Sequence, residues 1–217
     1  MAKKLLELNV DFKEQSKLGD NGSFSLQPLE RGYGTTIGNA MRRVLLTSIP
    51  GAAITHVKID GVQHEFSTID GVKEDVADII MNLKKVRFKL MDNTPDKVTL
   101  SIKGKKSFTA QDIQNASDQF EVLNPEEYIT EVNSKGKLDI ELRIGIGKGY
   151  VPSEANDMPN LSVGTLSIDS IFNPVTNVTF NVQPVPGAKD PIEILSLHVT
   201  TDGSITAKDA VSYTATY

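Results

Sequence analysis

The sequence predicts an α+β fold in which a strand-rich domain is inserted into a discontinuous domain made of an antiparallel sheet and two helices. Apolar and polar residues alternate through much of the segment 86–144, as is typical of antiparallel strands. Two segments, 35–48 and 72–85, instead repeat their apolar residues at helical spacing. Strand patterns return at 178–199, before a last short helical segment.

The first elements are two strands joined by a turn. Apolar residues alternate with polar ones over 6–12, which predicts a half-buried strand. The turn sequence GDNG at 19–22 follows, and the apolar residues of 24–29 continue in a second strand.

The stretch 31–51, RGYGTTIGNAMRRVLLTSIPG, predicts the first helix. Thr35 or Thr36 is suited to cap it, and Pro50-Gly51 ends it. Residues at i, i+3, i+4, i+7, i+8 and i+11 form a mostly apolar stripe: Ile37, Ala40, Met41, Val44, Leu45 and Ser48. The opposite face carries Gly38, Asn39, Arg42, Arg43 and Leu46, where an ordinary solvated face would be rich in Glu and Lys. We therefore expect one packing face and one recognition face.

The remaining elements follow the same two patterns. A strand over 52–59 leads to a hairpin-type turn at Asp60-Gly61, and a second helix is expected over about 72–85. Strands are expected over 86–90, 98–102, 138–144, 178–182 and 195–199. Thr206 and Asp209 have the spacing of a capping box that opens the last helix, with Ala207, Ala210, Val211 and Ala215 on one side. A helix of this length is marginal alone, so it must dock on something.

Domain boundaries are expected at the two proline-containing exits, Pro50-Gly51 and Asn173-Pro174. The predicted domains are residues 1–50 with 175–217, and the inserted strand-rich domain 51–174.

The composition excludes several classes of function. The chain has 217 residues, 39% hydrophobic and 24% charged, which is ordinary for a globular protein. Its net charge of −5 does not favour DNA binding over the whole surface, so any DNA contact would be local or indirect, through a partner. There is no cysteine, which excludes thiolate chemistry and suits a reducing compartment. No signal peptide or membrane-length apolar run is present, and we expect a cytoplasmic protein without membrane contact.

No catalytic constellation is visible, and we expect no active site, cofactor or metal in this chain. The three histidines, His56, His64 and His198, form no metal-binding pattern, and His56 and His64 are expected on strand surfaces. Carboxylates are scattered rather than clustered for metal-dependent catalysis.

The alternative from another class is a nucleotide-binding enzyme that uses the glycines Gly32, Gly34 and Gly38 before the first helix. The preceding strand is polar and contains Pro28, and no βαβ unit follows. The structural interpretation of these glycines is a tight turn and close backbone approach. A monomeric interaction module is a further alternative.

Several motifs resemble the N-terminal assembly domain of the bacterial RNA polymerase alpha subunit. The densest is PLERGYGTTIGNAMRRVLLTSIPGAAITHVKIDGVQHEFSTIDGVKEDVADIIMNLK at 28–84. The resemblance continues through GKGYVP at 147–152, IDSIFNPV at 168–175 and TDGSI at 201–205. It implies a non-catalytic subunit that forms a homodimer and nucleates assembly of the beta and beta-prime subunits, which would supply the catalysis.

The resemblance also implies contact residues. Arg43 matches an arginine important for binding the beta subunit, and we extend that surface to Gly38, Asn39, Arg42 and Leu46. Candidate beta-prime contacts are Lys84, Ile168, Asp169 and Ser170. The candidate dimer interface, shared by the first and last helices, comprises Ile37, Met41, Val44, Leu45, Ala210 and Val211.

The sequence departs from the family pattern in two regions. It stops inside the expected last helix, and the linker and DNA-binding C-terminal domain of the family do not follow. The segment PVPGAKDPIE at 184–193 stands where the family usually has an arginine-containing loop. These departures leave the strength of dimerisation and any contact with promoter DNA open.

Overall fold

The computed structural model describes residues 13–14, 20–91, 96–104, 106–156, 161–187 and 191–216. The fold is α+β, and all strand pairs among the described residues are antiparallel. The chain divides into unit 1, Met1–Ile49 with Asn173–Tyr217, and unit 2, Pro50–Phe172. The limits differ by one or two residues from the sequence-based boundaries. The strand expected over 6–12 lies outside the described residues.

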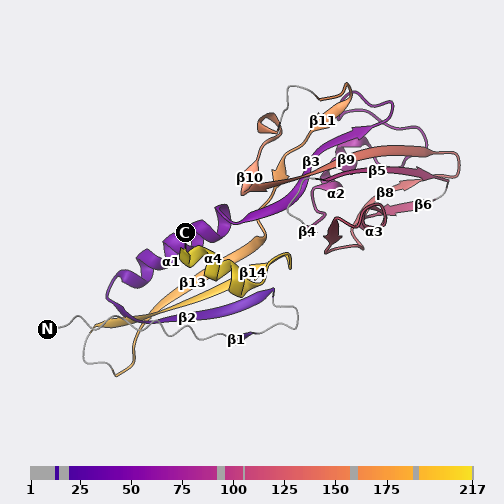
Figure 1. Ribbon diagram of the computed structural model, residues 1–217. Helices are drawn as coiled ribbons and strands as arrows, with labels where there is room; N and C mark the ends of the chain where they lie inside the picture. The colour runs from indigo at the N-terminus through magenta and orange to yellow at the C-terminus, as the bar shows by residue number, and fades with distance from the viewer. Residues whose placement is uncertain are drawn as a thin grey trace. The chain divides into compact units, whose positions relative to one another are not determined.

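Unit 1 is a four-stranded sheet with two helices on one face (Figure 1). The strands, in the order β1-β2-β14-β13, are β1 (Lys13–Glu14), β2 (Asn21–Glu30), β14 (Ile192–Thr201) and β13 (Val175–Pro184). Helix α1 (Tyr33–Thr47) packs mainly on β13 and β14, and helix α4 (Ala207–Thr216) packs on α1, β14 and β2. Among the described helices, none is long and apolar enough to cross a membrane.

The core of unit 1 follows from strand alternation. Phe24 of β2, Leu197 of β14 and Phe180 of β13 stand side by side in register, so one apolar row crosses three strands beneath the helices. The opposite sheet face is polar, and there the Ser23 hydroxyl and His198 Nδ1 lie 2.8 Å apart in a hydrogen bond. The sheet therefore has one face to cover, and the helices cover it.

Both helix starts are set by local chemistry. Helix α1 begins at Tyr33, earlier than a cap at Thr35 or Thr36 would place it, because Gly32 takes φ 90° as the N-cap. Helix α4 begins as expected: the Asp209 backbone N–H donates to Thr206 Oγ1 at 3.1 Å, and the Thr206 hydroxyl donates to Asp209 Oδ2 at 2.7 Å. Its buried side includes Thr214, whereas Ala215 is exposed.

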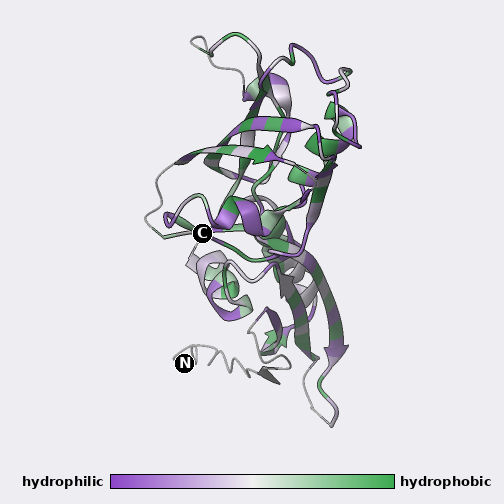
Figure 2. Ribbon diagram, turned by 90° about the vertical axis from the view of Figure 1, so that its right-hand side faces the viewer, coloured by the Kyte–Doolittle hydropathy of each residue, from purple (hydrophilic) through white to green (hydrophobic). Residues whose placement is uncertain are grey.

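Unit 2 is built on a six-stranded sheet of order β5-β9-β3-β4-β7, in which β11 also pairs with β3. Its strands are β3 (Pro50–Ile59), β4 (Phe88–Leu90), β5 (Asp96–Lys103), β7 (Phe120–Val122), β9 (Lys137–Lys148) and β11 (Thr165–Ser167). Two smaller sheets pair β6 (Lys106–Thr109) with β8 (Tyr128–Val132), and β10 (Tyr150–Val151) with β12 (Ser170–Ile171). The helices are α2 (Val76–Leu83), α3 (Ala110–Gln114) and the 3-10 turn η1 (Ser153–Ala155). Figure 2 shows hydrophobic and hydrophilic residues alternating along these strands.

Two local predictions in unit 2 were wrong. Helix α2 begins at Val76, not Val72, because the Asp75 side chain caps it and the Lys73 N–H pairs with the Glu131 carbonyl of β8 instead. Asp60-Gly61 is a turn, with Gly61 at φ 77°, but it does not form a hairpin. The strand partners of β3 come from distant segments, β9, β4 and β11.

A hydrogen-bond network around the half-buried carboxylate of Glu74 fixes the loop before α2. Glu74 accepts hydrogen bonds from the Tyr128 hydroxyl at 2.7 Å, the Thr130 hydroxyl at 2.8 Å and the Glu131 backbone N–H at 3.0 Å. Burial by itself would raise the pKa of Glu74, but these three donors outweigh it and hold the pKa below its ordinary value. Burial and the same hydrogen bond raise the pKa of Tyr128 to about 12.

The Glu74 network predicts acid sensitivity. Because the folded-state pKa of Glu74 is depressed, its stabilisation is present above the unfolded pKa and is lost as pH falls through the folded pKa. We expect Glu74→Gln to lower the free energy of unfolding at pH 7 by about 1 kcal/mol and to flatten its decline in acid. Urea unfolding from pH 7 to 3 measures this, with Glu126→Gln, at an exposed site, as the control. An unchanged pH profile in Glu74→Gln would contradict the assignment.

Candidate functional site

Helix α1 rests on β13 through two glycines. A Cβ atom added to Gly34 would lie 2.6 Å from Val182 Cγ1, and one added to Gly38 would lie 2.6 Å from Phe180 Cδ2. Gly34, Gly38 and Leu45 are the buried residues of the helix. The placement of Gly38 on the recognition face was therefore wrong, and so was that of Ala40, which is exposed, on the packing stripe. Hydrophobic periodicity did not identify this buried side of the helix, because glycine has no apolar side chain that would mark its position.

The same contact contradicts a nucleotide site at these glycines. Phosphate binding at a helix start requires free backbone N–H groups. Here the Gly34 N–H donates to Glu193 Oε2 at 3.2 Å, so a carboxylate of β14 already lies at the positive end of the helix dipole. The glycines permit close packing instead.

The exposed side of α1 carries a basic surface made of Asn39, Arg42 and Arg43. All three residues are exposed. Among the residues that the structure describes, no acidic side chain forms an ion pair with either arginine. Leu46, predicted beside them, is half-buried and packs against the core of unit 1. The guanidinium groups are therefore available to bind a partner.

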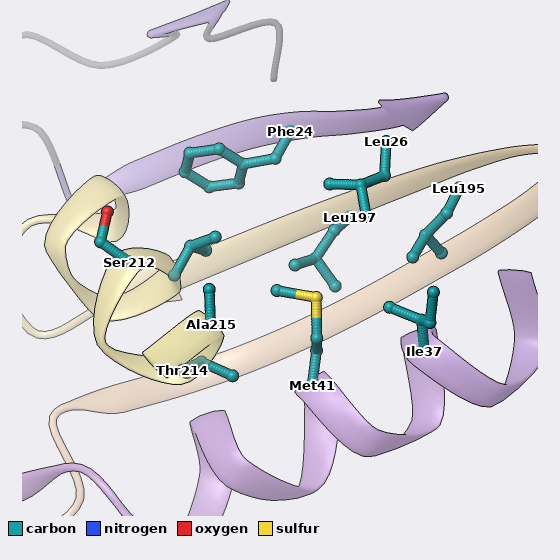
Figure 3. Close-up of a pocket in the computed structure, with 10 residues that line it drawn as sticks. Phe24, Leu26, Ile37, Met41, Leu195, Leu197, Ser212, Thr214 and Ala215 are labelled. Atoms are coloured by element: carbon teal, nitrogen blue, oxygen red, sulfur yellow. The ribbon is translucent and has the colours of Figure 1, made fainter. Parts of the chain in front are cut away.

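An apolar groove runs between α1, α4 and the sheet of unit 1 (Figure 3). It has a volume of about 390 Å³. Ile37 and Met41 of α1 point into it from one side, and Ser212, Thr214 and Ala215 of α4 lie on the other (Figure 3). Its remaining lining is Phe24, Leu26, Leu195, Leu197 and Val211. The sequence analysis missed the strand residues, although the alternation of β2 and β14 places them on one face.

The groove divides the predicted dimer residues. Ile37 and Met41 are half-buried and line it, and Val44 is half-buried elsewhere on α1. Leu45 and Ala210 are both 0% exposed and belong to the core of this chain, so their assignment to an interface was wrong. Val211 is buried in the same core and also lines the groove.

In unit 2, the structure brings two of the four predicted beta-prime residues together. Lys84 Nζ, at the end of α2, lies 2.8 Å from Asp169 Oδ2 between β11 and β12. The hydrogen bond from Lys84 holds the pKa of Asp169 below its ordinary value, against the opposing effect of burial. Ile168 and Ser170 are buried on either side and are not accessible, which corrects their assignment as contacts.

The histidines and acids of the described residues form no metal-binding cluster. No group of three His, Cys, Asp or Glu residues there is arranged to hold a metal ion. His64 is exposed, as expected, but the expectation for His56 was wrong, since it is 1% exposed. His56 does lie on the outer face of the sheet, opposite Arg143 of β9, and the segment that contains Asn156 covers it.

The comparison with known proteins identifies the family. Residues 57–173, more than half of the chain, match the family model described as the RNA polymerase Rpb3/RpoA insert domain. The chain belongs to the family of RNA polymerase alpha subunits. It is 51% identical over 207 residues to the DNA-directed RNA polymerase subunit alpha of Chloroherpeton thalassium. The aligned region covers 95% of this chain and 62% of that protein. It is 52% identical over 204 residues to the subunit of Chlorobaculum tepidum, and 50% over 192 residues to that of Salinibacter ruber. The chain thus spans about 62% of the length of the first of these relatives.

The glycine contact of α1 can be tested by adding one methyl group. Gly→Ala inside an exposed helix stabilises by about 0.5–1 kcal/mol, but at Gly38 the methyl group would overlap the Phe180 ring. We expect Gly38→Ala to destabilise unit 1 by about 1–3 kcal/mol in urea unfolding. Ala40→Gly, on the exposed side of the same helix, is the control and should cost only about 0.5–1 kcal/mol. A stabilised Gly38→Ala variant would show that the contact does not constrain the helix.

Proposed function

We propose that this chain is a non-catalytic scaffold subunit of bacterial RNA polymerase, which forms a homodimer and binds the beta and beta-prime subunits. The observation that carries the proposal is the exposed arginine pair on α1, which has no acidic ion-pair partner among the described residues. Arginine forms bidentate hydrogen bonds with carboxylates and is enriched at the energetic centres of protein interfaces. An exposed pair of arginines on a helix is therefore suited to bind a large protein partner, which we infer to be the beta subunit.

The apolar groove supports a second copy of this chain as the other partner of unit 1. Its lining includes half-buried Leu26, Ile37 and Met41, whose apolar surface would gain about 25 cal/mol per Å² on burial. A twofold dimer uses the same surface on both copies. A groove flanked by α1 and α4 is therefore suited to bind the same helices of a second copy. The names of the relatives, subunits of DNA-directed RNA polymerase, agree with an assembly role.

The Lys84–Asp169 pair is our proposed contact for the beta-prime subunit. Both side chains are half-exposed, with 27% and 37% of their surfaces accessible. A cation and an anion fixed at 2.8 Å offer a partner one donor group and one acceptor group in a defined geometry.

Catalysis and DNA binding are assigned to the partners. In this proposal, the large subunits perform nucleotidyl transfer, and this chain reaches DNA only through the complex. A bacterial transcription complex works where the chromosome lies, and on that ground we assign the chain to the cytoplasm.

The beta-contact proposal predicts a variant that folds but binds poorly. We expect Arg43→Ala to change the free energy of unfolding by no more than about 0.5 kcal/mol, because its side chain is exposed. Affinity for the beta subunit should fall about tenfold or more, as for a central interface arginine. Quantitative pull-down with purified beta subunit measures this, with Lys135→Ala as a control that removes an exposed charge elsewhere. If beta is captured equally by Arg43→Ala and the parent chain, the proposed face is incorrect.

The dimer proposal predicts that a charge placed in the groove separates the copies. Ser212 is exposed and lines the groove, so Ser212→Arg should leave the fold intact while inserting a long cation into the apolar surface. Sedimentation at micromolar concentration should show a dimer for the parent chain and a monomer for the variant. Thr35→Arg, on α1 outside the groove, should remain dimeric. A parent chain that sediments as a monomer at these concentrations would overturn the dimer proposal.

A further inference from the structure

His56 is a buried histidine whose two ring nitrogens both have partners. It lies in β3 between Arg143 of β9 and Ser167 of β11. Its Nδ1 is 2.8 Å from the Thr55 hydroxyl, and its Nε2 donates to the backbone carbonyl of Asn156 at 2.9 Å. A carbonyl oxygen accepts only, so Nε2 must carry a proton in this arrangement.

The segment that covers His56 is a single closed turn. Asn156 follows η1, and its backbone N–H donates to the Ser153 carbonyl at 3.1 Å. The turn has no buried residue in η1 that could anchor it by hydrophobic packing. Its attachment to the sheet therefore depends on polar contacts, of which the His56 hydrogen bond is one.

The same turn holds the chain on both sides of Asp169. The side-chain amide of Asn156 donates to the Ile168 carbonyl at 2.8 Å and to the Ser170 hydroxyl at 2.9 Å. The Ser170 hydroxyl in turn donates to the Ile54 carbonyl of β3 at 2.8 Å. Residues 168–170 are thereby tied to β3 and to the turn.

A third tie reaches the carboxylate itself. The backbone of Ser153, the first residue of η1, forms a hydrogen bond that helps to lower the pKa of Asp169, together with the larger effect of Lys84. The turn thus contacts His56 at one end and Asp169 at the other, while Asn156 fixes the two residues that flank Asp169.

The geometry points to His56 and Asn156 as positioning residues: together they clamp the turn 153–156 on β3 and so hold the Asp169 carboxylate where it meets Lys84. The hydrogen bonds of His56 and Asn156 act on the turn and on the 168–170 backbone. The inference concerns the shape of this ion-pair surface, and only its consequence for beta-prime binding rests on the proposed function.

The test is NMR on the full chain, with variants that remove one hydrogen bond at a time. His56→Leu introduces an apolar side chain of similar size that cannot donate to the Asn156 carbonyl, whereas the amide of His56→Gln can. Asn156→Ala removes the two hydrogen bonds that the Asn156 amide donates to Ile168 and Ser170. Asn156 is half-buried, and this variant tests the inference if His56→Leu does not fold. Ala155→Ser, an exposed and neutral change in the same turn, is the matched control.

Two readouts separate positioning from general stability. In Asn156→Ala and His56→Leu we expect loss of the nuclear Overhauser contact between Lys84 and Asp169, and a rise of the Asp169 pKa toward its ordinary value in a carboxyl titration. His56→Gln and Ala155→Ser should retain the contact and the depressed pKa. If the contact and the pKa of Asp169 stay unchanged in Asn156→Ala, the positioning role is disproved.

Binding to the beta-prime subunit is then measured on the same variants. Reduced capture by Asn156→Ala, matching that of Asp169→Asn, would link the clamp to assembly. A displaced Asp169 with unchanged capture would support the clamp and overturn the proposed beta-prime contact, so the two failures are distinguishable.

Discussion

The close approach of α1 to β13, through Gly34 and Gly38, is the constraint on which unit 1 depends. Because two positions that face the sheet carry no side chain, the helix lies directly on Val182 and Phe180. That contact determines which residues face outward, and it leaves the arginines exposed. It also allows Glu193 of the neighbouring strand to reach the start of the helix, where its carboxylate is stabilised by the dipole. The glycine motif thus serves the packing of the helix on the sheet and leaves its opposite side exposed.

Unit 2 depends on a different kind of contact. Several of its segments are irregular, and polar side chains attach them to neighbouring strands. Glu74 fixes the loop before α2 to β8, and Asn156 fixes the turn after β10 to the strands around Asp169. In each case one side chain satisfies several donors or acceptors that a regular ladder would otherwise pair. The candidate contact pair Lys84–Asp169 is therefore held by backbone geometry as well as by charge attraction.

Sequence reasoning recovered what depends on period and local chemistry, including the alternating strands, the existence of α1 and α2, and the capping box at Thr206. It failed where a tertiary contact decides. Glycine has no hydropathy signal, so the sequence did not predict the burial of Gly38 against Phe180. The sequence also did not decide whether Leu45 belongs to the core of the chain or to an interface. His56 follows strand alternation correctly, but no sequence pattern predicts that a distant turn covers it. The groove needed the register of β2 against β14, which the sequence does not specify by itself.

The angular arrangement of α1 is compatible with the two partners that we propose for this helix. At about 100° per residue, Gly34, Gly38 and Leu45 fall within about 40° of one another and define the buried side. Ile37 and Met41 lie about 40–80° to one flank of that side, where they line the groove. Arg43 lies about 160° from the buried side, facing away from the sheet. A second copy seated in the groove would therefore leave Arg43 uncovered, so dimerisation and binding of a large subunit would not compete for the same surface. The two glycines set this arrangement, because they determine which side of α1 faces the sheet.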